Sequence, residues 1–401
     1  MFNSLKFKVI LFGFIFTFFS SFGQSYFLGL FNSSIREALS ITHGQFGSIY
    51  ASATLCSSLL LIWVGKKIDD VNIFKFAFFV TVLLSFACFF FSRITSVFLL
   101  FVAIFLMRFS GQGMMSHTAS TTISRYFTRT RGKALSISWF GLSSAEFVMP
   151  VLMVYLLTII DWQNLWLIFS ITVLIVLPIA SFLLIKNLNL DSRETNDENI
   201  KEVKIKQWKR IEVIKDYRFY IISSNMLAMP WIFTGFAVFQ SFVQTSKGWG
   251  PYVIAQSFMS YSILSVLTLF LSGFLIDKFT SRKLLIYMNI PLLLSVIVLF
   301  FFDTPVTAFV FLGLVGISNG FANILGSSTW AELYGVKYLG SIKALTTALM
   351  VFATAFGTAL FGYLIDIGFT VGDIATVSGI YIFISLISLF FVRKKLNPVI
   401  I

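Results

Sequence analysis

The chain has 401 residues, of which 57% are hydrophobic and only 12% are charged, and 50 of them are phenylalanine. Because a soluble domain carries about 25% charged residues, this composition excludes an ordinary soluble enzyme and indicates an integral membrane protein. The formal net charge of +13 comes from short basic clusters between apolar segments, not from one basic domain, and this excludes a nucleic-acid-binding protein.

Apolar segments long enough to cross a bilayer recur along the whole chain. A membrane-spanning helix needs about 20 apolar residues. The first segment follows Lys6 and Lys8, as a secretory signal would, but it is longer than a signal core, so we expect it to be retained. The sequence therefore predicts an all-α integral membrane protein with twelve transmembrane helices, at 8–31, 45–64, 74–91, 97–122, 135–158, 164–185, 219–243, 252–275, 284–302, 306–330, 343–365 and 375–392.

Lysine and arginine are distributed unevenly between the predicted connections. Alternate connections carry basic clusters, at Lys66 and Lys67, at Arg125, Arg129, Arg131 and Lys133, at Lys278, Arg282 and Lys283, and at Arg393, Lys394 and Lys395. The connections on the other side have only single basic residues, at Arg36, Arg93 and Lys247. Positively charged loops stay in the cytoplasm. We therefore expect a multi-pass protein of the cell inner (plasma) membrane, with both termini cytoplasmic.

The connection after the sixth helix differs from the others. Residues 186–218 carry nine Lys or Arg and seven Asp or Glu, and Trp208, Ile211 and Ile214 follow one another at helical spacing. This pattern predicts a solvated linker with a short interfacial helix at 201–215. The predicted domains are an N-terminal six-helix bundle at 1–186, a cytoplasmic linker at 187–217 and a C-terminal six-helix bundle at 218–401.

The two halves of the chain repeat each other. Gly65-x-x-x-Asp69 follows the second helix, and Gly273-x-x-x-Asp277 follows the eighth helix with the same spacing, 208 residues later. Arg131–Leu135, before the fifth helix, has a similar counterpart before the eleventh, at Gly340–Leu345. Duplicated halves are typical of parallel-repeat transporters, whose solute site lies between the halves near the bilayer midplane. The repeat therefore favours a transporter over a channel or an enzyme.

These motifs resemble a known family. The two Gly-x-x-x-Asp motifs with their basic residues, and Arg108–Gly113 in the fourth helix, are similar to the signatures of the major facilitator superfamily. The resemblance spans the chain and implies the MFS fold of two pseudo-symmetric six-helix halves, with secondary transport by alternating access. Arg131–Leu135, Asp161–Trp162 and Trp330–Tyr334 resemble bacterial members near the proton-linked monocarboxylate porters. Those porters commonly have an acid and an arginine in the eighth helix, whereas the eighth helix here has no charge from Gln256 to Gly273.

Two charged residues are predicted near the middle of the bilayer. Arg108 lies eleven residues into the fourth helix, which places it about 16 Å from the edge of a ~30 Å apolar core, and Glu146 lies halfway along the fifth helix. Charges at this depth are costly and mark function. We expect Arg108 to bind a substrate carboxylate and Glu146 to exchange a proton in response. The alternative is a permanent structural ion pair between the two.

In this fold the first, fourth, seventh and tenth helices line the path. Their polar or aromatic residues at mid-depth are the predicted substrate-binding residues, namely Gln24, Tyr26, Arg108, Gln112, Asn225, Trp231, Asn319 and Asn323. The alternative for each Asn or Gln is a hydrogen bond between helices. The set contains one fixed positive charge and no negative one, so an organic anion is the expected substrate.

The Gly-x-x-x-Asp motifs predict a conformational latch. A glycine lets two helices approach, and an aspartate at the cytoplasmic end of a helix can accept from a helix N-terminus or an arginine. The predicted latch residues are Gly65, Asp69, Arg125, Gly273, Asp277 and Arg282. The alternative is that these aspartates only end their helices and the basic residues only set the topology.

Two functions follow as expectations. The first is proton-coupled symport of a small organic anion, similar to a monocarboxylate, by a monomer whose partners are the substrate, protons and the lipid bilayer. The second is proton-driven efflux of amphipathic compounds. We expect no enzyme activity, cofactor or metal site, because Cys56 and Cys88 lie in apolar segments and the two histidines, His43 and His117, are far apart in sequence.

Overall fold

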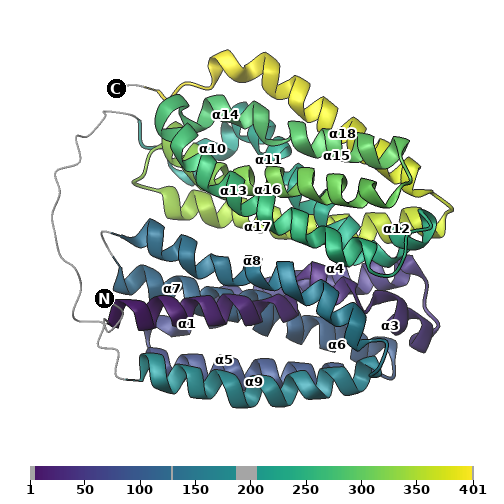
Figure 1. Ribbon diagram of the computed structural model, residues 1–401. Helices are drawn as coiled ribbons and strands as arrows, with labels where there is room; N and C mark the ends of the chain where they lie inside the picture. The colour runs from purple at the N-terminus through teal and green to yellow at the C-terminus, as the bar shows by residue number, and fades with distance from the viewer. Residues whose placement is uncertain (1–4, 128–129, 187–205, 400–401) are drawn as a thin grey trace. The chain divides into compact units, whose positions relative to one another are not determined.

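A computed structural model of the chain describes residues 5–127, 130–186 and 206–399, without the side chains of Asp69, Arg131, Asp277 and Ser327. The chain divides into two compact units, Met1–Asn199 and Ile200–Ile401, which we describe separately. Among the described residues, twelve helices are long and apolar enough to cross a membrane. The prediction of an all-α protein with twelve spans is therefore confirmed (Figure 1).

The first unit contains six spans built from shorter elements. Its first span is interrupted, its fourth contains a π-helical segment, and a short helix precedes its second. The elements are α1 (Leu5–Ser20), η1 (Ser21–Gly23), α2 (Ser25–Gly29), α3 (Asn32–Leu39), α4 (His43–Val64), η2 (Gly65–Asp69), α5 (Ile73–Phe91), α6 (Val97–Met107), η3 (Arg108–Met115), α7 (Ser116–Tyr126), α8 (Arg131–Leu156) and α9 (Trp162–Ile185).

The second unit also contains six spans. The predicted seventh helix ends at Val238, and a separate short helix follows it. The elements are α10 (Arg210–Lys215), α11 (Tyr217–Val238), α12 (Gln240–Ser246), α13 (Val253–Phe279), α14 (Ser281–Met288), α15 (Ile290–Phe301), α16 (Pro305–Tyr334), α17 (Leu339–Asp366), α18 (Val371–Val392) and η4 (Arg393–Lys395).

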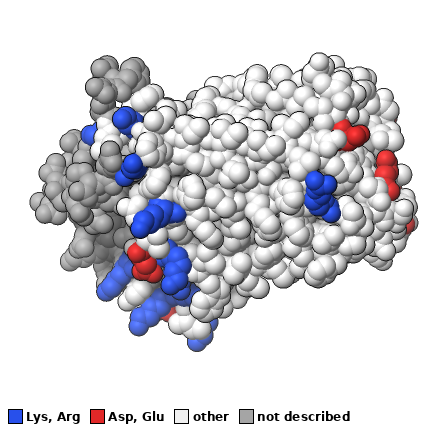
Figure 2. Space-filling model, turned by 90° about the horizontal axis from the view of Figure 1, so that it is seen from below, with Lys and Arg blue, Asp and Glu red and all other residues white. Residues whose placement is uncertain are grey.

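Large apolar side chains cover much of the outer surface of the helices. Phe98, Phe274 and Phe391 are each more than 70% exposed, which water would penalise and lipid tails favour. Figure 2 shows one face, on which charged side chains gather toward the ends and leave a long stretch without them. The protein is therefore a multi-pass membrane protein.

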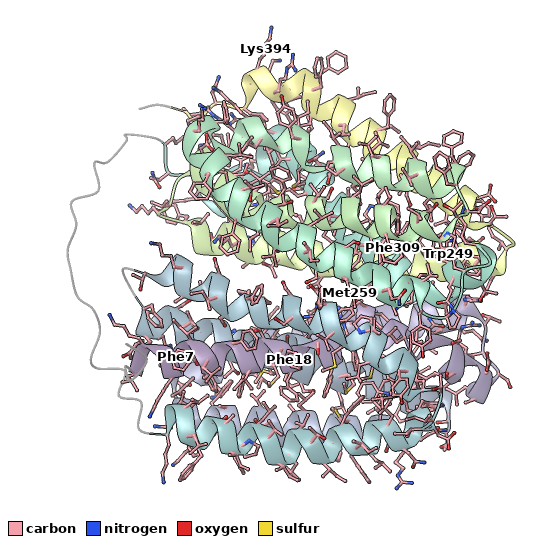
Figure 3. All side chains as sticks on the ribbon, in the orientation of Figure 1. Phe7, Phe18, Trp249, Met259, Phe309 and Lys394 are labelled. Atoms are coloured by element: carbon pink, nitrogen blue, oxygen red, sulfur yellow. The ribbon has the colours of Figure 1, made fainter. Side chains whose placement is uncertain are left out.

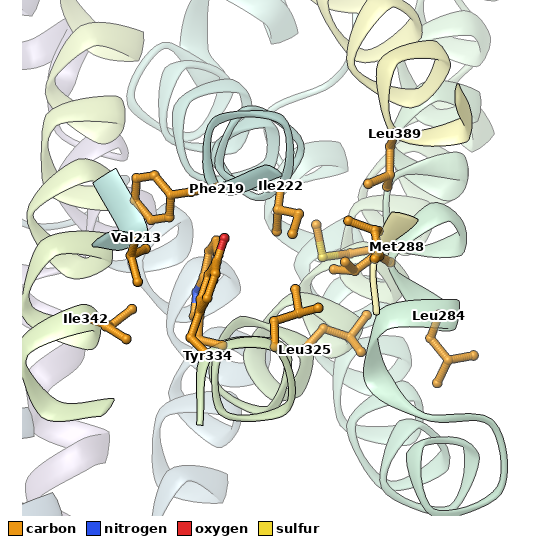
Figure 4. Close-up of a cluster of buried hydrophobic side chains, with 13 residues drawn as sticks. Val213, Phe219, Ile222, Leu284, Met288, Leu325, Tyr334, Ile342 and Leu389 are labelled. Atoms are coloured by element: carbon orange, nitrogen blue, oxygen red, sulfur yellow. The ribbon is translucent and has the colours of Figure 1, made fainter. Parts of the chain in front are cut away.

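The linker helix is shorter than predicted and packs against other helices of the second unit. Only α10 forms a helix within the described part of 201–215, and residues 201–205 lie outside the described residues. Val213 is fully buried in a cluster with Phe219 and Tyr334 (Figure 4), whereas Ile211 is 60% exposed. Trp208 precedes the helix and its ring lies 5.4 Å from that of Tyr334. The buried face of α10 is therefore the one that carries Val213, not the predicted face with Ile211. Packing against protein decides which face is buried, and helical spacing alone does not reveal it.

The start of α10 is fixed by Glu212. Its carboxylate accepts from the Lys209 main-chain N–H at 2.7 Å and pairs with the Lys206 ammonium at 3.0 Å. These two partners hold the pKa of Glu212 below its usual value, the main-chain hydrogen bond being the larger cause. The carboxylate is therefore charged at neutral pH and suits the N-terminus of a helix.

Candidate functional site

The first span is broken in the middle. α1 ends at Ser20, one 3-10 turn follows, and Gln24 is extended with φ −79° and ψ 150° before α2 begins at Ser25. A break frees main-chain groups from helical hydrogen bonds, and inside a membrane these groups must find partners within the protein. The carbonyl oxygen of Gly23 accepts from Nη1 of Arg108 at 3.1 Å. The break therefore supplies a ligand for this arginine.

The fourth span is irregular next to the break. Between α6 and α7 the chain forms a π-helix from Arg108 to Met115, a geometry that often marks functional sites. Two glycines bring the segments into main-chain contact: a Cβ on Gly23 would overlap main-chain atoms of Met107 and Gln112, and one on Gly111 would lie 2.7 Å from the Gly23 nitrogen. The break and the π segment therefore fix each other's position.

The Arg108 guanidinium is surrounded by neutral groups. The side chain is 3% exposed, and Nη1 also donates to Ser25 Oγ at 3.2 Å. The guanidinium lies 5.4 Å from the ring centre of Tyr50, whose hydroxyl donates to the same Ser25 oxygen at 2.9 Å. Nε of Arg108 is buried and has no hydrogen-bond partner among the described residues. The site thus holds a positive charge with an unused donor.

Glu146 does not pair with Arg108. Among the described residues no ion pair joins the two side chains, so the permanent pair considered above is not formed in this structure. Glu146 is 8% exposed, lies one turn before Pro150 on α8, and interacts electrostatically with the phenol of Tyr26. Because proline has no N–H, the Glu146 carbonyl has no main-chain donor one turn later. The acid and the arginine are therefore separate groups.

Four predicted binding residues lie at the helix break. Arg108 binds the break directly, and the main chain of Gln112 contacts Gly23. Gln24 is the extended residue itself and is half-buried, as is Gln112, whereas Tyr26 is 2% exposed. Ser25 and Tyr50 were not among the predicted residues: Tyr50 lies on α4 in the second span, which was not expected to line the path, and a single serine does not stand out in an apolar helix.

The second unit contains a cavity of about 190 Å³ between α11, α14, α16 and α17. Its lining includes the predicted residues Asn319 and Asn323. Asn319 donates to Ser265 Oγ at 2.9 Å, while the Asn323 side chain is exposed. Much of the remaining lining is methionine or aromatic, namely Met226, Met229, Met288, Met350, Phe233 and Trp330. The cavity is therefore mainly apolar with two amide groups on one wall.

Asn225 and Trp231 do not belong to the described lining of this cavity. Asn225 is fully buried, and its Nδ2 lies 3.5 Å from Ser385 Oγ on α18. Trp231 packs edge-on against Tyr381, with ring centres 5.2 Å apart. In this structure both side chains fill contacts between helices, which is the alternative raised above for the asparagine. Their binding role stays a prediction.

The first latch motif is held by residues of α7. The Gly65 carbonyl oxygen lies 3.0 Å from Nε2 of His117, and the Ile68 carbonyl accepts from Nη1 of Arg125 at 3.0 Å. The side chain of Arg125 therefore contacts the motif at a main-chain carbonyl group of the motif. The Asp69 side chain lies outside the described residues, so the predicted role of its carboxylate stays a prediction.

The second latch motif has a different set of contacts. Arg282 pairs with Glu332 of α16, at 2.9 Å from Nε to Oε1, and donates to Asn397 Oδ1 at 2.6 Å. A Cβ added to Gly273 would meet no described atom of its own unit within 4 Å. The Asp277 side chain lies outside the described residues. Arg282 is thus bound within its own unit, and a latch role for it stays a prediction.

No metal-binding group is evident in the part of the chain that the structure describes. There, no three His, Cys, Asp or Glu side chains lie close enough together to hold an ion. The described polar side chains at the helix break, at Glu146 and on the cavity wall of the second unit instead carry hydroxyls, amides, one guanidinium and one carboxyl.

Comparison with known proteins gives a family and a fold. The profile of the Major Facilitator Superfamily matches residues 13–358. A search of curated proteins found no match. A bacterial homologue of the human lysosomal transporter Spinster, inward-facing and unoccupied, has a TM-score of 0.74 at 13% identity, covering 98% of each chain. The nucleoside transporter NupG has a TM-score of 0.69 at 15% identity, covering 98% of this chain and 99% of its own. At these identities the likeness shows the fold alone.

Proposed function

The chain belongs to the major facilitator superfamily, and on that basis we propose that it moves a small organic anion, similar to a monocarboxylate, in symport with protons. Membership supports secondary transport, and the proposal treats the chain as a transporter and not as an enzyme. Alternating access of the two six-helix halves around a site near the midplane is the mechanism that such duplicated chains use. A single chain contains both halves, so we expect a monomer to work.

The observation that supports an anion is the environment of Arg108. Its described hydrogen-bond acceptors, Gly23 O and Ser25 Oγ, are both neutral, and Nε has no partner among the described residues. A positive charge buried at mid-membrane depth with no acid in direct contact is costly. A substrate carboxylate would supply both a negative charge in contact with Arg108 and an acceptor for the planar guanidinium.

Charge balance supports a proton as the second solute. With Arg108 positive and Glu146 negative, the empty site has no net charge. An anion alone would make the site negative, and moving that charge through a low-dielectric barrier is unfavourable. One anion together with one proton on Glu146 leaves the site neutral again. Empty and loaded states can then reorient at similar cost, whereas the half-loaded states cannot.

Efflux of an amphipathic compound is the second candidate. The cavity of the second unit supports it, because methionine and aromatic side chains surround the two amides of Asn319 and Asn323. Flexible methionines adapt to varied apolar shapes. An uncharged amphipathic solute would use this cavity and would leave Arg108 with a structural role at the helix break.

The test is uptake by proteoliposomes of labelled monocarboxylates under an imposed inward proton gradient. We expect wild type to accumulate an acid. The uptake rate of Arg108→Ala should be about 10- to 100-fold lower, which is the effect expected from the loss of a charged hydrogen bond. Arg93→Ala, which removes an arginine from an exposed connection, is the matched control and should transport normally. If wild type moves no acid, or if Arg108→Ala moves it normally, the anion proposal fails.

The same preparation tests the proton site. Glu146→Gln keeps the shape of the side chain and removes its titration. We expect this variant to exchange labelled for unlabelled acid but not to accumulate acid in response to the proton gradient. If gradient-driven accumulation persists in Glu146→Gln, the proton is carried elsewhere.

A further inference from the structure

A basic pocket lies at the end of the second unit, between α14 and the end of α18. It has a volume of about 370 Å³, and its lining includes Lys283, Arg393 and Lys394 together with Tyr287 and Leu389. None of these three cations has an ion-pair partner among the described residues, whereas Arg282, on the same pocket, is already paired with Glu332. The pocket therefore concentrates uncompensated positive charge.

An apolar groove lies farther along α18, next to α15, which continues the same membrane span as α14. It is formed by α15 and α18, has a volume of about 370 Å³ and is lined by side chains such as Val296, Phe300, Gly379 and Phe383. Phe300 and Phe383 are about half exposed, so the groove opens on the lipid-facing surface. The basic pocket and the apolar groove thus follow one another along a single helix seam.

The spacing of the two cavities matches half a bilayer. Leu293, at the near edge of the groove, follows Lys283 by ten positions, which is about 15 Å along a helix and about half of a ~30 Å hydrocarbon core. Figure 3 shows Lys394 at the end of α18, with its side chain pointing away from the helices. A ligand with an anionic head at the pocket and a chain along the seam would reach the groove.

We propose that this seam binds an anionic glycerophospholipid, with its headgroup phosphate between Lys283, Arg393 and Lys394 and one acyl chain extending along α14, α15 and α18 toward the groove. Basic pockets between helix ends at the membrane surface attract anionic headgroups. The exposed Tyr287 ring lies at the pocket rim, where an amphipathic ring suits the headgroup level. The site is independent of the solute path and of the proposed substrate.

The first test is native mass spectrometry of the delipidated full-length protein titrated with phosphatidylglycerol or with phosphatidylcholine of the same chains. Wild type should prefer phosphatidylglycerol. The variant Lys283→Gln/Arg393→Gln/Lys394→Gln should bind it about 100-fold more weakly, since each of the three cations near an anionic surface contributes about fivefold. The matched control is Lys75→Gln/Lys133→Gln/Lys343→Gln, three exposed lysines elsewhere, and it should keep the preference.

Three results would overturn the proposal. They are equal binding of the two lipids by wild type, an unchanged preference in the pocket variant, and an equal loss in the control variant. Soluble glycerol phosphate separates a lipid site from a general anion site. If it displaces phosphatidylglycerol at equal concentration, the lipid assignment is wrong.

The second test addresses the acyl chain. Gly379 lines the groove, and a Cβ there would lie 3.6 Å from Val296 Cγ2, an ordinary contact, so Gly379→Leu adds side-chain volume at the groove. We expect this variant to bind long-chain phosphatidylglycerol several-fold more weakly and to bind the six-carbon form as wild type does. Equal binding of both lipids by Gly379→Leu and wild type would place the chain outside the groove.

Discussion

Gly23 is the residue on which the geometry of the Arg108 site depends. Its carbonyl accepts from Arg108, and its missing side chain lets the broken first span touch the main chain of the π segment. Any other residue there would separate the two segments, because the atoms in the way belong to the main chain and cannot rotate aside. The position of Arg108 is therefore set by the absence of a side chain on another helix.

Gly23→Ala should destabilise the protein by about 1–3 kcal/mol, the usual cost of forcing an added methyl group into a packed contact. The measurement is the thermal unfolding midpoint of the full chain in detergent. Gly340→Ala is the control, because a Cβ there meets no described atom within 4 Å and alanine favours the helix. A variant Gly23→Ala as stable as Gly340→Ala would show that the two segments do not need this contact.

At the scale of elements, the ends of the fourth and tenth spans perform the same task with opposite charges. Arg125 donates to the Ile68 carbonyl after the second span, and Glu332 accepts from the Ser281 main-chain N–H at 2.9 Å, at the start of α14. The two residues are 207 positions apart, one less than the offset of the sequence repeat. Each unit therefore ties the connection between two neighbouring spans to a third span.

Glu332 caps α14 from another helix. The N-cap residue, Thr280, has φ 70° and makes no side-chain cap of its own, so the carboxylate of Glu332 takes that role. Glu332→Ala should lower the stability by about 1–3 kcal/mol, the value of a hydrogen bond to a charged group. Glu37→Ala, at an exposed position, should change it by less than about 0.5 kcal/mol. Equal thermal midpoints for the two variants would contradict the capping role.

At the scale of the whole molecule, the distribution of charge predicts the orientation in the membrane. Basic residues cluster in alternate connections, so the ends of the spans that carry them are expected in the cytoplasm. Single basic residues occur in the remaining connections, as at Arg36 and Arg93. Because the number of spans is even, both termini are expected on the cytoplasmic side.

Cysteine labelling of intact cells tests this orientation. In a chain without Cys56 and Cys88, a cysteine at Glu37 should react with a membrane-impermeant maleimide. A cysteine at Lys133 should react only after the cells are permeabilised. Both positions are exposed in the structure, so access depends on the side of the membrane alone. The reverse pattern would contradict cytoplasmic termini.

The number of spans, their approximate positions and the family could all be predicted from the sequence. Each of these depends on features that are read along the chain: apolar length against the thickness of a bilayer, and motifs at a constant offset. Arg108 and Glu146 could be identified in the same way, because a charge inside an apolar helix is visible without any neighbour.

The surroundings of those two charges could not be predicted from the sequence and became visible only in the folded chain. The break at Gln24, the π segment, the pairing of Arg108 with Gly23 and Ser25, and its separation from Glu146 all depend on contacts between segments far apart in sequence. The same reason placed Asn225 and Trp231 in helix contacts, gave Asn319 both a hydrogen bond to Ser265 and a place on the cavity wall, and left Asn323 on that wall. Helical periodicity gives the depth of a residue in the membrane, but the packed neighbour decides whether its side chain meets another helix or open space.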